Sequence, residues 1–219
     1  MIRNILPFAA ALAFTFSAAA AVAQDAPASP LDKQLSRIDL AVQGVGMLNK
    51  TVQGTLPPSA AQEAGPTISD VPSNTLGALV TLRYVAKPFV GIEGNYGYAR
   101  YTENYSNIGG VQTQANEYTL GYLVTPAFTI FEFQPFLSAG AGSIGFRPTP
   151  GGGQQLQIQA RAVYYYSAGL QKEYFSEHFG FRGGFRQLFF LAPDYGQNYL
   201  TIKQRTITSE PMVGFYLKF

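Results

Sequence analysis

The chain has 219 residues, no cysteine and a formal net charge of +2. Charged residues make up 13% of it, about half the share usual in a soluble domain, whereas 17 Phe and 14 Tyr are a high aromatic content. A disulfide scaffold is therefore excluded, and the near-neutral charge gives no reason to expect a nucleic-acid partner.

The N-terminal residues have the features of a secretory signal. Arg3 precedes an apolar run, and Ala21-Val22-Ala23 provides small residues at the spacing that a signal peptidase accepts. We expect residues 1–23 to be cleaved and the mature chain to be exported. A membrane-spanning helix over the same run is the alternative, but the run is Ala-rich, contains Pro7 and has no basic stop after it. Residues 24–36 are then predicted to form a flexible lead.

Alternation of apolar and polar residues predicts eight strands in the mature chain. They cover residues 37–48, 75–86, 89–104, 111–125, 133–146, 156–173, 178–191 and 199–219. Residues 49–74 contain four prolines and no period, which predicts one long loop. Eight consecutive strands with no helical pattern among them indicate an antiparallel up-and-down meander, and the even number places both chain ends on one side.

The last strand carries a wholly apolar row of one parity, formed by Val213, Phe215, Leu217 and Phe219. A terminal strand that alternates in this way and closes on Phe resembles the insertion signal of bacterial outer-membrane β-barrels, which their assembly machinery recognises. With the eight strands, the mature chain resembles the small eight-stranded outer-membrane barrels of the OmpA and OmpX group. The resemblance implies an all-β, eight-stranded antiparallel up-and-down transmembrane β-barrel, integral to the bacterial outer membrane. Both termini would be periplasmic, the loop 49–74 external, and the lipid bilayer and the assembly machinery its partners; we also expect a monomer.

The charged residues of the strands share the parity opposite to the apolar rows. These residues are Arg83, Glu93, Glu117, Arg161, Arg182, Arg186 and Glu210. A soluble lipocalin-like barrel, the rival fold, would be apolar inside and polar outside. Here the charged parity is narrow and rich in glycine, which favours a polar lumen beneath a lipid-facing coat.

The height of each charge along its strand predicts two tiers in the lumen. Arg83, Glu93 and Arg182 lie near the periplasmic strand ends, and Glu117, Arg186 and Glu210 lie higher. Buried charges are costly unless they are paired, so we expect salt bridges in each tier that plug the barrel.

The sequence offers little for catalysis. Its only histidine, His178, falls in a predicted periplasmic turn, and with no cysteine we expect no catalytic residue, no metal site and no cofactor. Lys203 and Arg205 could contact lipopolysaccharide phosphates or could be ordinary solvated rim charges. The favoured function is a structural or surface-interaction role with a plugged lumen. A narrow channel or carrier for small apolar molecules is the alternative, and a lipid-modifying outer-membrane enzyme comes third.

Overall fold

A computed structural model describes residues 30–56, 65–87, 89–176 and 178–219. The predicted signal peptide and residues 24–29 of the lead lie outside these residues. The chain divides into two units, residues 1–35 and 36–219. In the first unit α2 (Pro30–Leu35) is a short helix where the sequence had predicted only a flexible lead. Proline suits the first turn of a helix, and Leu, Lys and Gln are good helix formers. Among the described residues no helix is long and apolar enough to cross a membrane.

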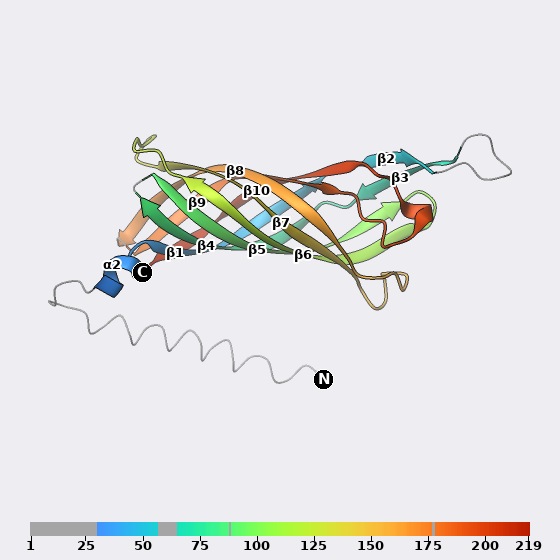
Figure 1. Ribbon diagram of the computed structural model, residues 1–219, viewed down its shortest axis with the longest axis horizontal. Helices are drawn as coiled ribbons and strands as arrows, with labels where there is room; N and C mark the ends of the chain where they lie inside the picture. The colour runs from blue at the N-terminus through green and yellow to red at the C-terminus, as the bar shows by residue number, and fades with distance from the viewer. Residues whose placement is uncertain (1–29, 57–64, 88, 177) are drawn as a thin grey trace, which may run out of the picture. The chain divides into compact units, whose positions relative to one another are not determined.

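The second unit is a closed antiparallel barrel of eight strands, which confirms the predicted up-and-down topology (Figure 1). The strands are β1 (Ile38–Asn49), β4 (Thr75–Lys87), β5 (Val90–Tyr105), β6 (Gly109–Val124), β7 (Gln134–Pro148), β8 (Gln159–Ser176), β9 (Phe179–Leu191) and β10 (Arg205–Lys218). Each strand pairs with its neighbours, and β1 closes the barrel by pairing with both β4 and β10. Asp39 lies opposite Lys218, so the first and last strands meet at one end, called here the terminal end; the opposite end is the loop end.

Two strands occupy the segment 49–74, where the sequence predicted a loop without strands. β2 (Val52–Thr55) pairs with β3 (Thr67–Pro72), and β3 pairs in turn with β5. On the other side of this chain segment, the amide of Lys50 donates to the carbonyl of Ile207 in β10. β2 and β3 therefore extend the hairpin of β1 and β4 beyond an irregularity at the loop end. Their short length and flanking prolines conceal the alternation that marks longer strands.

The predicted strand 199–219 is shorter in the structure. Residues 198–200 form a 3₁₀ helix, η1 (Asn198–Leu200), and β10 begins only at Arg205. Leu200 and Ile202 are buried and contribute to the core at the loop end. The apolar residues of this segment therefore pack into the core at the loop end and do not form part of a strand.

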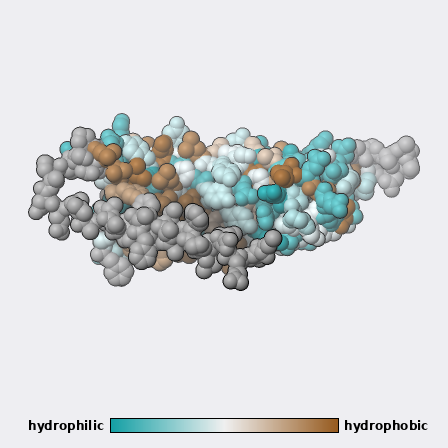
Figure 2. Space-filling view, turned by 90° about the horizontal axis from the view of Figure 1, so that it is seen from below, coloured by the Kyte–Doolittle hydropathy of each residue, from teal (hydrophilic) through white to brown (hydrophobic). Residues whose placement is uncertain are grey.

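The outer surface of the barrel changes polarity along its length. Near the terminal end the outward side chains form an apolar belt, defined by Val42, Leu82, Ile92, Tyr96, Tyr98, Tyr118, Leu120, Tyr122, Val124, Leu137, Tyr164, Tyr166, Phe181, Phe185, Val213, Phe215 and Leu217. Towards the loop end the same outward row of β5 continues with Arg100, Thr102 and Asn104. Figure 2 shows apolar residues gathered over the half nearer the C-terminus and polar residues over the other half.

The interior changes in the opposite sense. Near the terminal end the buried inward residues include Arg83, Glu93 and Arg182, whereas towards the loop end they include Tyr101, Phe146 and Leu188. One half of the barrel is therefore apolar outside and charged inside, and the other half is polar outside and mainly apolar inside, apart from the buried acids Asp70 and Glu103.

Candidate functional site: the barrel interior

A lower tier of charges crosses the lumen near the terminal end. Arg83 Nε donates to Glu93 Oε2 at 2.8 Å, and Arg182 Nη2 donates to Asp39 Oδ1 at 2.8 Å. Both arginines also donate to the side-chain oxygen of Gln171, at 3.3 Å and 3.0 Å. The side-chain oxygen of Gln171 thus links the two arginines, and the two cations and two anions of the tier balance in charge.

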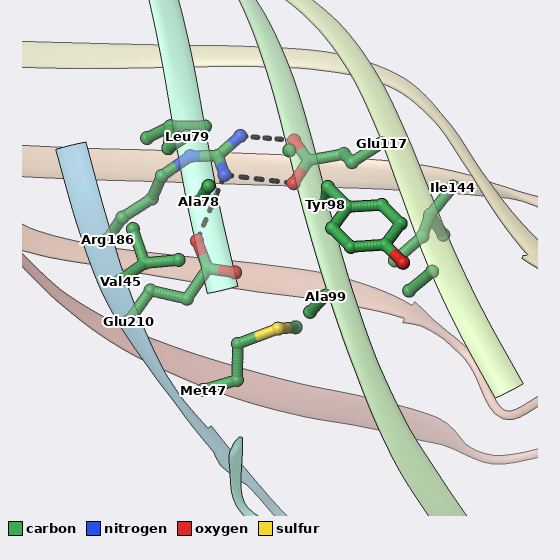
Figure 3. A pocket seen from close by; sticks show the side chains of 12 residues that line it. Val45, Met47, Ala78, Leu79, Tyr98, Ala99, Glu117, Ile144, Arg186 and Glu210 are labelled. Atoms are coloured by element: carbon green, nitrogen blue, oxygen red, sulfur yellow. Dashed lines mark hydrogen bonds and ion pairs between the residues drawn. The ribbon is translucent and has the colours of Figure 1, made fainter. Parts of the chain in front are cut away.

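An upper tier lies deeper in the barrel and is built around Arg186. Its guanidinium forms a bidentate pair with Glu117, and its Nη1 also donates to Glu210 Oε2 at 3.0 Å (Figure 3). Nη2 donates to the hydroxyl of Thr119 at 3.1 Å. Arg186, Glu117 and Glu210 come from three strands and are at most 4% exposed. A single arginine therefore ties β9 to both β6 and β10.

Tyr165 joins the two tiers. Its hydroxyl donates to Glu93 Oε1 at 2.9 Å, and its ring centroid lies 4.5 Å from the guanidinium carbon of Arg186. Two glycines leave the space that this ring occupies. A Cβ at Gly121 would lie 2.2 Å from the Tyr165 hydroxyl, and one at Gly140 would lie 2.7 Å from its Cε1. The inward glycines therefore make room for a polar aromatic plug.

The predicted site residues fall into three places. Six of the seven predicted lumen charges lie in the two tiers, at the heights that the sequence predicted. Arg161 does not, because its Nη2 pairs with Asp194 Oδ2 at 2.9 Å at the loop end. Its position high on β8 puts it beyond the polar lumen. Sequence reasoning also missed Asp39, Tyr165 and Gln171, although all three share the inward parity of their strands.

The other predicted residues lie on the surface. The four residues of the terminal apolar row, Val213, Phe215, Leu217 and Phe219, are 40–55% exposed. Lys203 and Arg205 are exposed, at the loop end of the chain segment that leads into β10. His178 is exposed in the turn between β8 and β9, where its Nδ1 lies 3.1 Å from the carbonyl oxygen of Lys218.

The space around the tiers is small. The cavity beside the upper tier, which Val45, Met47 and Ile144 also line, measures about 10 Å³, room for about one water (Figure 3). A vestibule of about 350 Å³ opens at the terminal end and reaches Asp39 and Gln171 of the lower tier. Above the upper tier, Tyr195 and Leu200 of the loop between β9 and β10 are buried.

A pair of buried acids lies at the loop end. Asp70 on β3 and Glu103 on β5 are each 1% exposed, and neither forms a salt bridge among the described residues. Burial raises the pKa of Asp70 to about 6, although a hydrogen bond with Glu103 opposes this shift. Burial and the charge of Asp70 raise the pKa of Glu103 well above its usual value. Two such carboxyl groups are stable together when they share a proton, as in other carboxylate dyads.

The acid pair predicts that the loop end loosens as the pH rises. Both pKa values are raised in the folded state, so the protonated acids stabilise the folded protein relative to the unfolded chain. For Asp70 this contribution to the free energy of unfolding is complete below about pH 4 and is lost as the pH rises through about 6. A shift of this size corresponds to roughly 3 kcal/mol. Hydrogen exchange of the β2 and β3 amides, corrected for intrinsic rates, should be faster at about pH 8 than at about pH 5. The Asp70→Asn, Glu103→Gln double variant should lose most of this difference; an unchanged difference would assign it to other groups.

No protein-family model matches the sequence, and neither does any curated protein. Among solved structures, the chain is similar to Neisserial surface protein A, with a TM-score of 0.51 and 12% identity over 83% of this chain and 97% of that chain. The chain has the fold of the small eight-stranded outer-membrane β-barrels. Ail of Yersinia pestis (TM-score 0.46, 14% identity, 84% and 99% covered) is also similar. So is the N-terminal barrel domain of OprF from Pseudomonas aeruginosa (TM-score 0.43, 14% identity, 82% and 97% covered).

The architecture of this barrel suits a lipid environment. Every strand of the closed barrel has a partner on both sides, so the barrel wall presents no open sheet edge to lipid. The apolar belt faces outward and the charges of both tiers face inward. This arrangement suits a β-barrel that spans a lipid bilayer.

Proposed function

We propose that this barrel has a structural or surface-interaction role, with a lumen plugged by side chains and both termini in the periplasm. The observation that carries the proposal is the continuous set of contacts from Asp39 through the lower tier and Tyr165 to Glu210. The two tiers and the ring between them occupy the lumen where a channel would pass. The periplasmic placement of the terminal end is supported by the lengths of the connections. Two of its three turns have two residues, whereas three of the four connections at the loop end have ten or more.

Conductance in planar bilayers tests the plug. Purified wild-type protein should show no stable conductance steps, because ion passage would require both tiers to open. The Tyr165→Ala variant removes the ring between the tiers, and leak in this variant alone would identify the lumen as the path. Steady conductance of the wild-type protein would overturn the plug and favour the narrow channel.

The proposed role is not enzymatic. His178 is exposed and contacts the backbone of Lys218, so no activated nucleophile is assigned to it. A surface role would instead use the loop end, where Lys203 and Arg205 are exposed cations and the guanidinium carbon of Arg205 lies 5.9 Å from the ring centroid of the belt residue Tyr164. They are the candidates for contact with lipopolysaccharide phosphates, which accept charge-assisted hydrogen bonds.

We expect the C-terminal residue to matter for assembly in cells. Phe219→Ser should reduce the amount of protein in outer-membrane fractions several-fold, because it removes the end of the terminal apolar row. Tyr199→Ser, an exposed aromatic residue at the loop end, is the matched control and should have little effect. Immunoblots of membrane fractions, with the shift between heated and unheated samples, measure the folded protein. Equal levels of the two variants would contradict the assigned role of Phe219.

A further inference from the structure

The connection between β6 and β7, residues 125–133, differs from the other turns at the terminal end. The turns after β4 and β8 are only two residues long, residues 88–89 and 177–178. This one is longer and exposes three large apolar side chains beyond the end of the barrel: Phe128 is 59% exposed, Ile130 42% and Phe131 90%. Clustered exposed apolar residues mark interaction sites more often than single ones do.

The backbone of this turn places Phe131 at its tip despite a conformational cost. Ile130 and Phe133 form a bridge through two N–H···O bonds of 2.8 Å and 2.9 Å. Phe131 and Glu132 between them have φ angles of 49° and 67°, in the left-handed region. Tight hairpin turns of this kind favour Asn and Gly, and other residues are strained there. A contact of the Phe131 ring outside the barrel would offset that cost.

The turn is continuous with the apolar belt. Beside it, Phe133, Tyr174, Phe179, Phe181 and Phe215 line a groove of about 340 Å³ on the outer surface. Phe181 and Phe215 belong to the belt that faces the acyl chains.

The one charged group on the turn is neutralised. This group is Glu132, whose Oε2 lies 2.5 Å from Nζ of Lys172, a residue that also lines the groove. The same Nζ lies 5.5 Å from the centroid of the Phe133 ring. The turn and the groove thus present aromatic rings and an ion pair, the combination that suits the boundary between lipid headgroups and acyl chains.

We propose that residues 125–133 and the adjacent groove form a phospholipid-binding foot. Phe128, Ile130 and Phe131 lie at the headgroup boundary of the leaflet at the terminal end, and an acyl chain occupies the groove. Lipid is the occupant because the groove opens onto the belt that lipid already covers. The inference rests on the proposed orientation only for the assignment to the periplasmic leaflet.

Fluorescence can test the foot cleanly because the chain contains no tryptophan. Three single-tryptophan variants of the full mature chain are needed: Phe131→Trp in the foot, Phe215→Trp in the belt and Tyr199→Trp at the loop end. Each is folded into phosphatidylcholine vesicles, with and without lipid brominated near the ester end of its acyl chain. We expect brominated lipid to quench the Phe131→Trp variant at least half as strongly as the Phe215→Trp variant. Acrylamide should quench it several-fold less than the Tyr199→Trp variant.

The controls separate failure of the foot from failure of membrane insertion. An additional variant, Tyr122→Trp, places its tryptophan in the belt but outside the groove, so its quenching by brominated lipid reports insertion alone. If that variant is quenched while the Phe131→Trp variant is open to acrylamide and insensitive to bromine, the foot lies in water and the proposal is overturned. A periplasmic protein would then be the remaining kind of partner. Phe128→Trp gives the same test if the Phe131→Trp variant does not fold.

Discussion

Replacing Arg186 with methionine should lower the free energy of unfolding by about 3–5 kcal/mol. The substitution removes the only cation of the upper tier and leaves Glu117 and Glu210 without a cationic partner, both at most 4% exposed. Methionine keeps much of the side-chain volume, so the loss reflects stranded charge more than a cavity. Urea unfolding in lipid vesicles, followed by the gel shift between folded and unfolded protein, measures it.

Two matched variants sharpen this result. Arg205→Met removes an exposed arginine of the neighbouring strand and should cost less than about 1 kcal/mol. Adding Glu117→Gln and Glu210→Gln to Arg186→Met should recover part of the loss, because the charges that lacked a partner are gone. If Arg186→Met were no worse than Arg205→Met, the upper tier would contribute nothing to stability.

Leu120→Arg should cost roughly 2–4 kcal/mol of stability in a bilayer. Leu120 is 66% exposed on the outward row of β6, with belt residues Tyr118 and Tyr122 on either side. An arginine there must lie in acyl chains or bend towards a distant headgroup layer. Gln157→Arg, an exposed change in the loop between β7 and β8, is the control and should be nearly neutral. The comparison must be made in vesicles, since a micelle adapts more easily to a charge, and equal stability of the two variants would show that Leu120 does not face lipid.

Phe181 shows why the structure was needed to choose this site. Alternation along β9 predicts that its side chain faces outward, and parity alone would place it as deep in the bilayer as Leu120. In the structure it lies opposite Lys172, close to the turns of the terminal end. An arginine at Phe181 could reach the headgroups there, so we expect a smaller loss than at Leu120.

Alternation along the strands was sufficient to predict the barrel and the face of each strand, because the side-chain period of a strand is two and both surfaces select residues strongly. The position of a residue along its strand could also be predicted by counting from the strand end, which is why Arg83, Glu93 and Arg182 were grouped together. Parity does not reveal at which height along the barrel the interior changes from polar to apolar. Arg161 has the inward parity of the lumen charges, yet it lies where the interior has become apolar and instead pairs with Asp194. The link through Tyr165 was missed for a related reason: which inward ring reaches which charge depends on the stagger of the strands, and no single strand encodes it.

The opposite polarity of the two halves gives the barrel two distinct sources of cohesion. Towards the loop end, Tyr101, Phe146 and Leu188 are withdrawn from water, so that half is held by the hydrophobic effect as a soluble protein is. In the other half, lipid surrounds the belt and buried ion pairs and backbone hydrogen bonds hold the wall together. Urea weakens the first kind of cohesion directly. Rising urea should therefore unfold the half at the loop end first and leave the belt half folded in the bilayer, so that denaturation of the barrel takes place in two steps.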